Sequence, residues 1–74
     1  MIDRILTTVS EVLRMEVSVN TTQKNCVKWD SLMHINIIIA LEDAFDMSFE
    51  PDEIARMTSI ANMQQIIQNK KNHV

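Results

Sequence analysis

The sequence predicts an all-α fold: a small four-helix bundle with three longer helices, one short third helix and a long first loop. Three observations support this prediction. The 74 residues include no glycine, no tyrosine and one proline, a composition that suits helices. Apolar residues recur at helical spacing in three segments, and turn-forming residues fill the long stretch that lacks this spacing. At this length we expect a single domain, residues 1–74.

The first helix is expected from about Ile2 to Met15, where apolar residues recur every three or four positions and charged residues lie opposite them. Residues 16–29 show no helical period. They contain the turn formers Asn20-Thr21-Thr22 and Lys24-Asn25, and Val17-Ser18-Val19 has the composition of a brief extended segment. Such a long loop is either functional or only the connector between two neighbouring helices.

The second helix is expected to begin at Asp30-Ser31 and to end near Phe45. Both starting residues are favourable N-caps, and an apolar pattern follows them directly. At about 100° per residue, this helix has two apolar faces. The core face contains Ile37, Ile38, Leu41, Ala44 and Phe45. The second face is a stripe of Leu32, Ile35 and Ile39, surrounded by Ser31, Asn36, Glu42, Asp43 and Asp46.

Two further helices complete the predicted bundle. Pro51 suits the first position of a short third helix that ends near Met57, with acids in its first turn. Thr58 or Ser59 caps the last helix, and His73 is expected in its frayed tail. The buried stripe of the last helix is expected to be Ile60, Met63, Ile66 and Ile67, with Lys70 and Lys71 at its C-terminal end.

The second apolar stripe has two explanations. A neighbouring helix or the long loop could cover it, or it could be a docking strip for a partner. We favour docking, because exposed aliphatic side chains with a rim of carboxylates are typical of binding surfaces. The charge pattern agrees: residues 30–55 contain seven acids and no Lys or Arg, within a chain of net charge −3. Such a field steers a basic partner and weakens with salt.

Composition also excludes several classes of protein. The acidic balance argues against nucleic-acid binding, and no apolar run reaches membrane-spanning length, so we expect no membrane insertion. A single cysteine, Cys26, rules out an internal disulfide and is expected to be a small packing residue. Because the start of the chain has no basic-then-apolar leader, we expect a cytoplasmic protein.

Most enzyme sites are excluded by the absence of glycine. Phosphate-binding loops, nucleophile elbows and calcium loops need backbone conformations that glycine supplies. His34 lies three residues after Ser31, but no glycine-built turn is available for an oxyanion hole. We therefore expect no catalytic residue and no metal site, and a His34 at the surface or at the core edge.

The segments Trp29-Asp30-Ser31-Leu32 and Ile37-Ile38-Ile39-Ala40-Leu41-Glu42-Asp43-Ala44-Phe45 resemble an acyl carrier protein. That family has Asp-Ser-Leu at the start of an acidic second helix, which ends in an aliphatic-Leu-Glu-acid-x-Phe stretch. The resemblance continues through the short helix after Pro51 and the Met57-Thr58-Ser59-Ile60 junction. It covers nearly the whole chain.

The resemblance implies that Ser31 carries a covalent 4′-phosphopantetheine arm, taken from coenzyme A by a phosphopantetheinyl transferase, with Asp30 and Leu32 beside it. The arm ends in a thiol that holds an acyl or aminoacyl group as a thioester, so the chain is a carrier and not an enzyme. The other implied partners are loading and unloading enzymes with basic docking surfaces, and we expect a monomer. The implied partner-binding residues are Ile35, Asn36, Ile39, Glu42 and Asp43.

Two departures from the family pattern suggest a specialised carrier. Fatty-acid carriers usually have acids two and five residues after the serine, where this chain has Met33 and Asn36. Trp29 before Asp-Ser is more typical of specialised or biosynthetic-cluster carriers than of the housekeeping one, and we expect a dedicated carrier in a secondary or cell-envelope pathway. The Trp29 side chain either stacks beside the arm or holds the loop on the bundle. Without the resemblance, Ser31 or Asp30 is simply an N-cap. The competing interpretation is an acidic helical protein–protein interaction adaptor without a prosthetic group.

Overall fold

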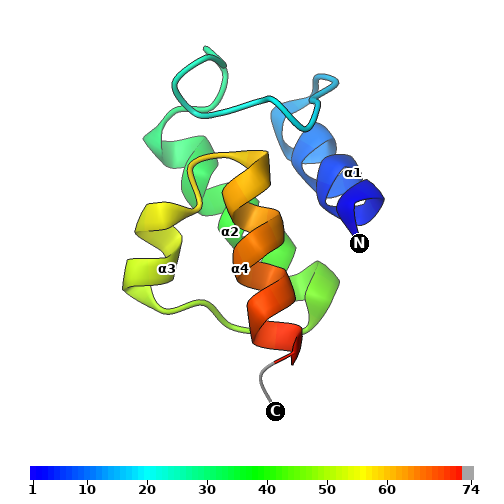
Figure 1. Ribbon diagram of the computed structural model, residues 1–74. Coiled ribbons are helices and arrows are strands. Elements are labelled where there is room, and N and C mark those ends of the chain that lie inside the picture. The colour runs from blue at the N-terminus through cyan, green and yellow to red at the C-terminus, as the bar shows by residue number, and fades with distance from the viewer. Residues whose placement is uncertain (73–74) are drawn as a thin grey trace.

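Four helices surround one core in the computed structural model, which describes residues 1–72. They are α1 (Ile2–Leu13), α2 (Ser31–Phe45), α3 (Pro51–Arg56) and α4 (Ile60–Asn72), and the long α1–α2 loop crosses one end of the bundle (Figure 1). The described part of the chain contains no strand, only an isolated bridge between Thr22 and Ser59. The predicted fold class is therefore confirmed. His73 lies outside the described residues.

The first two helices end without glycine. α1 ends at Leu13, two residues before the expected Met15, because Arg14 adopts the left-handed conformation with φ 56° and ψ 42°. Asp46 ends α2 in the same way, with φ 52° and ψ 55°. A residue with a Cβ pays a steric penalty in this conformation. α3 ends at Arg56, one residue earlier than expected.

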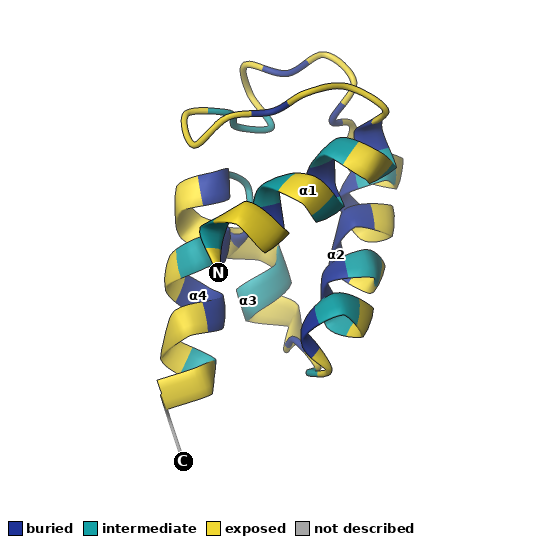
Figure 2. Ribbon diagram, turned by 90° about the vertical axis from the view of Figure 1, so that its right-hand side faces the viewer, coloured by how far each residue is buried: buried dark blue, intermediate teal, exposed yellow. Residues whose placement is uncertain are grey.

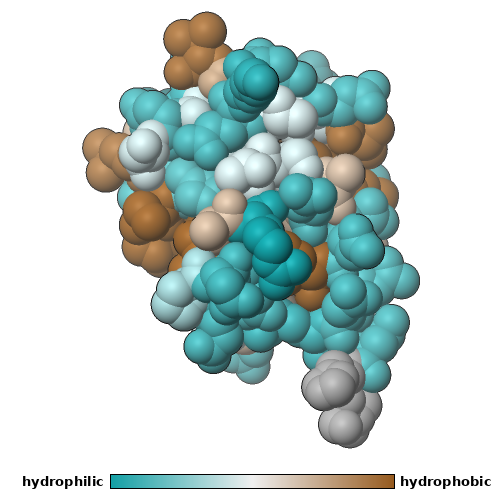
Figure 3. Space-filling view, turned by 60° about the vertical axis from the view of Figure 1, so that its left-hand side comes forward, coloured by the Kyte–Doolittle hydropathy of each residue, from teal (hydrophilic) through white to brown (hydrophobic). Residues whose placement is uncertain are grey.

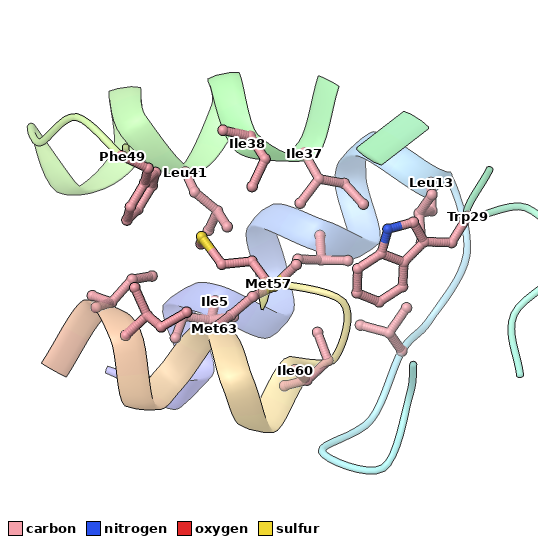
Figure 4. Close-up of a cluster of buried hydrophobic side chains, with 14 of the residues drawn as sticks. Ile5, Leu13, Trp29, Ile37, Ile38, Leu41, Phe49, Met57, Ile60 and Met63 are labelled. Carbon is pink, nitrogen blue, oxygen red and sulfur yellow. The ribbon is translucent and has the colours of Figure 1, made fainter. Parts of the chain in front are cut away.

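The core is formed by one face of each longer helix. α1 contributes Ile5, Val9 and Leu13, and α4 contributes its predicted stripe of Ile60, Met63, Ile66 and Ile67. Several of these side chains meet the α2 residues Ile37, Ile38 and Leu41 (Figure 4). Phe45 is also buried, whereas Ala44 is only partly buried. The predicted core face of α2 is thus confirmed, with Ala44 packed against the edge of the core.

The long loop is attached to the bundle by side chains and by main-chain hydrogen bonds. The Gln23 N–H donates to the Thr58 carbonyl at 2.8 Å, and the Ile60 N–H donates to the Thr21 carbonyl at 3.1 Å. These two bonds join the loop to the α3–α4 junction. Residues 17–19, which were expected to be extended, form no strand. Instead the loop adds three buried side chains to the core: Val17, Cys26 and Trp29.

The short helix α3 is held by polar contacts and by Ile54, which is partly buried against the core. None of its own six residues is buried, although Met57 directly after it is fully buried. Three contacts fix it to α2 and α4: His34 Nε2 to the Ile54 carbonyl at 2.9 Å, Lys70 Nζ to Glu53 Oε1 at 2.9 Å, and Asn62 Nδ2 to the Arg56 carbonyl at 2.9 Å. Within residues 1–72, none of the four helices combines the length and the hydropathy needed to cross a membrane.

Candidate functional site at the start of α2

Ser31 is the first residue of α2 and is exposed. Asp30 precedes it in an extended conformation, and its Oδ1 accepts the Met33 backbone N–H at 2.8 Å. This is the side-chain bond that defines an N-cap. Asp30 therefore caps the helix, and the interpretation of Ser31 as the cap is wrong. The Ser31 hydroxyl is left at the surface for other chemistry.

The start of α2 is electrostatically suited to an anion on Ser31. The first turn of any α-helix has backbone N–H groups without intrahelical acceptors, and the aligned peptide dipoles of this 15-residue helix add partial positive charge there. Phosphate groups bind favourably at such positions. An exposed serine at this place therefore fits the attachment of a phosphodiester.

An exposed aliphatic stripe begins next to Ser31. Leu32, Ile35 and Ile39 are 66%, 49% and 59% exposed, respectively. The outer side of α2 is accessible along its length, while its buried residues face the other helices (Figure 2). Neither a neighbouring helix nor the loop covers the stripe, so that explanation is wrong. Asn36 is exposed on the same helix.

The acidic residues of α2 differ in their freedom to meet a partner. Asp43 and Asp46 are exposed. Glu42 is half-buried, and its Oε2 accepts the Phe49 backbone N–H at 2.9 Å. One carboxylate oxygen of this predicted partner residue thus stabilises the α2–α3 loop. The sequence did not indicate this role, because it depends on how the loop folds back.

His34 is buried and lies at the core edge, one of its two expected locations. The Trp29 indole Nε1–H donates to its Nδ1 at 3.0 Å, and its Nε2 lies 2.9 Å from the Ile54 carbonyl oxygen. Both ring nitrogens are therefore occupied, which leaves none for a Ser-His pair with Ser31. A tryptophan five residues before a histidine was the only available sequence signal for this contact.

Trp29 holds the loop on the bundle. Its side chain is 2% exposed and lies close to the labelled core residues Leu13 and Ile37 (Figure 4). Of the two roles considered for this residue, the structure supports the packing role. The indole is therefore withdrawn from the surface where an arm on Ser31 would extend.

The acids near α3 serve as structural contacts. Glu53 Oε1 accepts the Glu50 backbone N–H at 2.7 Å and also pairs with Lys70. Across residues 1–72, no group of three or more His, Cys, Asp or Glu side chains is placed to hold a metal ion.

Hydrophobic atoms form several patches along the margin of the face in Figure 3, and much of the remaining surface is hydrophilic.

The chain matches no protein-family model and no curated protein. The assignment of a function therefore depends on the site at Ser31 and on the residues that resemble an acyl carrier protein.

Proposed function

We propose that the chain is a carrier protein that holds acyl or aminoacyl groups as thioesters on a 4′-phosphopantetheine arm attached to Ser31. The observation that carries this proposal is the exposed Ser31 hydroxyl at the start of α2, whose capping role is performed by Asp30. The exposed aliphatic stripe beside it provides a surface for partner enzymes.

In the attachment reaction the chain supplies only the Ser31 hydroxyl group. Ser31 Oγ forms a bond to the pantetheine-bearing phosphorus of coenzyme A, 3′,5′-adenosine bisphosphate leaves, and the transferase accepts the hydroxyl proton. Ser31 must be accessible and held at a defined place, and both conditions are met at the first residue of a helix packed on the core. The attached arm supplies the thiol for thioester chemistry.

The outer face of α2 is the proposed docking surface. Leu32, Ile35 and Ile39 offer apolar contact, Asn36 offers a polar one, and Asp43 adds negative charge. A partner that fits this surface has an apolar patch bordered by basic residues. We propose two kinds of partner with these features: a phosphopantetheinyl transferase, and the enzymes that load and unload the thiol.

Intact mass tests the proposal directly. After incubation with coenzyme A and a broad-range phosphopantetheinyl transferase, we expect the protein to gain the mass of one phosphopantetheine group. Ser31→Ala should gain nothing, because it lacks the attacking oxygen. Ser48→Ala, which removes another exposed serine, should be modified like the natural protein. If the natural protein gains no mass, the proposal is wrong and an adaptor without a prosthetic group is the better explanation.

We also propose that this carrier belongs to a specialised pathway and is poorly recognised by general fatty-acid enzymes. Two acids expected in fatty-acid carriers are replaced by Met33, which packs partly against the core, and by exposed Asn36. We expect Asn36→Glu to raise the rate with fatty-acid enzymes by about twofold to fivefold, the scale of one surface ion pair. Elongation on the natural protein at the rate of a housekeeping carrier would contradict this proposal.

A further inference from the structure

A buried pair of hydrogen bonds links the residue before the Asp30 cap to α3. An indole N–H can only donate, so Nδ1 of His34 must accept the Trp29 bond. A neutral imidazole then carries its proton on Nε2, and the Ile54 carbonyl, which can only accept, takes that proton's hydrogen bond. A single tautomer of His34 satisfies both contacts.

This pair is placed next to the proposed attachment residue. Trp29 lies two positions before Ser31, and only the cap Asp30 separates them. The Trp29 and His34 rings are stacked, with centroids 6.1 Å apart and an angle of 20° between their planes. The Trp29 backbone N–H also bonds to the Cys26 carbonyl at 3.1 Å. The chain that enters α2 is therefore fixed by both its side chain and its main chain.

His34, which accepts the Trp29 bond, also makes a second contact on another helix. A carbonyl or a serine at the same place would satisfy the indole equally well. His34 instead reaches onward to α3, an element with no buried residue of its own. The Ile54 contact thereby fixes the tautomer of the ring in which Nδ1 is free to accept the indole proton.

We propose that His34 is a positioning residue for Ser31, which it acts on through Trp29, and that the Ile54 bond holds the imidazole in the tautomer that Trp29 requires. The inference rests on the proposed function of Ser31 as the attachment site. His34 takes no part in the chemistry of attachment. It keeps the start of α2 in the orientation from which Ser31 Oγ is presented to the transferase.

Three variants separate the two halves of this contact. His34→Gln places an amide nitrogen near the position of Nε2, so it can keep the Ile54 bond while losing the Trp29 bond. His34→Asn places an amide oxygen near Nδ1, so it can keep the Trp29 bond while losing Ile54. Trp29→Phe removes the donor. Val9→Ala, a core truncation in α1, serves as the control for loss of stability alone.

The readout is steady-state phosphopantetheine transfer at a temperature where circular dichroism shows every variant to be folded. We expect His34→Gln and Trp29→Phe to lower kcat by about threefold to tenfold with little change in KM, because orientation is lost while the docking surface is kept. The double variant with His34→Gln and Trp29→Phe should be no slower than either single variant, because each single change already removes the Trp29–His34 bond. His34→Asn should retain most of the rate, and Val9→Ala all of it.

Opposite results overturn the inference. Rates that follow unfolding temperature, with Val9→Ala as slow as His34→Gln, reduce His34 to a structural residue. Multiplied effects in the double variant show that the two residues act separately. Ring ¹⁵N spectra of the natural protein provide an independent test, since a proton on Nδ1 contradicts the contact itself. If the natural protein is never modified while the spectra show the Nε2 proton, the proposed function fails and the positioning role fails with it, although the contact stands.

Discussion

Glu53 is the residue that most clearly fastens α3 to the rest of the molecule. Its Oε1 accepts the Glu50 backbone N–H at 2.7 Å and the Lys70 ammonium at 2.9 Å. Its side chain is only 17% exposed. These contacts, the Glu50 bond first, lower the pKa of Glu53 below its ordinary value of 4.5. The carboxylate therefore stabilises the fold above that pH, and its contribution is lost as the pH falls through the lowered value.

Glu53→Gln should remove this pH-dependent contribution. At about pH 7 we expect a lower thermal unfolding midpoint for the variant than for the natural protein. The difference should shrink as the pH falls through the lowered pKa of Glu53, because the natural protein then loses its carboxylate charge as well. Asp52→Asn is the matched control: its ion pair with Arg56 is 3.7 Å long and its side chain is 78% exposed, so little effect is expected at any pH. A difference that stays constant across the pH range would count against the assignment.

The residues at the proposed site were predictable to different degrees. Asp30 and Ser31 followed from local chemistry, because capping involves only neighbours in the chain. Glu42 and His34 did not, because their partners, Phe49 and Ile54, are seven and twenty residues further along. Such contacts depend on the path of a loop that carries no periodic signal of its own.

Among the elements, α1 and α2 share an uncommon solution to helix termination. Arg14 and Asp46 take the left-handed conformation that glycine usually provides. The C-cap N–H of Arg14 bonds to the Ser10 carbonyl, and that of Asp46 bonds to the Glu42 carbonyl. The helices therefore end where the tertiary path requires, at some cost in steric strain.

Arg14→Gly should relieve that strain. We expect the free energy of unfolding to rise by about 0.5–1 kcal/mol, because the left-handed penalty is removed while the unfolded chain gains some entropy. Denaturant unfolding measures the change. Arg14→Ala keeps a Cβ and should give no such gain. If both variants stabilise the protein equally, the effect comes from loss of the exposed arginine side chain and not from relief of backbone strain.

At the scale of the whole molecule, charge is distributed unevenly. Residues 30–55 contain seven acids and no Lys or Arg, and two of these acids pair with bases beyond the segment, Asp52 with Arg56 and Glu53 with Lys70. Basic residues from α1 and α4 also lie over aromatic rings near the end of α2: Arg4 and Lys71 over Phe45, and Lys70 over Phe49, at 5.3, 5.5 and 5.8 Å. The outer face of α2 is thus left with its acids and its aliphatic stripe.

Asp43→Lys should weaken electrostatic steering toward a basic partner. We expect association with a phosphopantetheinyl transferase to slow by roughly threefold at low ionic strength and by less at high ionic strength. Asp43 suits this test better than Glu42, whose carboxylate also holds the Phe49 N–H. Glu11→Lys makes the same charge change on exposed α1 and should have a smaller effect. Equal slowing at every salt concentration would contradict steering.

The sequence by itself determined the four helices, their order and the core faces of α2 and α4, because helical periodicity and capping are local properties. It also marked Leu32, Ile35 and Ile39 as a second apolar face. Only the tertiary structure decided that this face stays exposed and that Trp29 and His34 connect the start of α2 to α3. These outcomes depend on which segments meet in space, and a pattern along one helix cannot specify its neighbours.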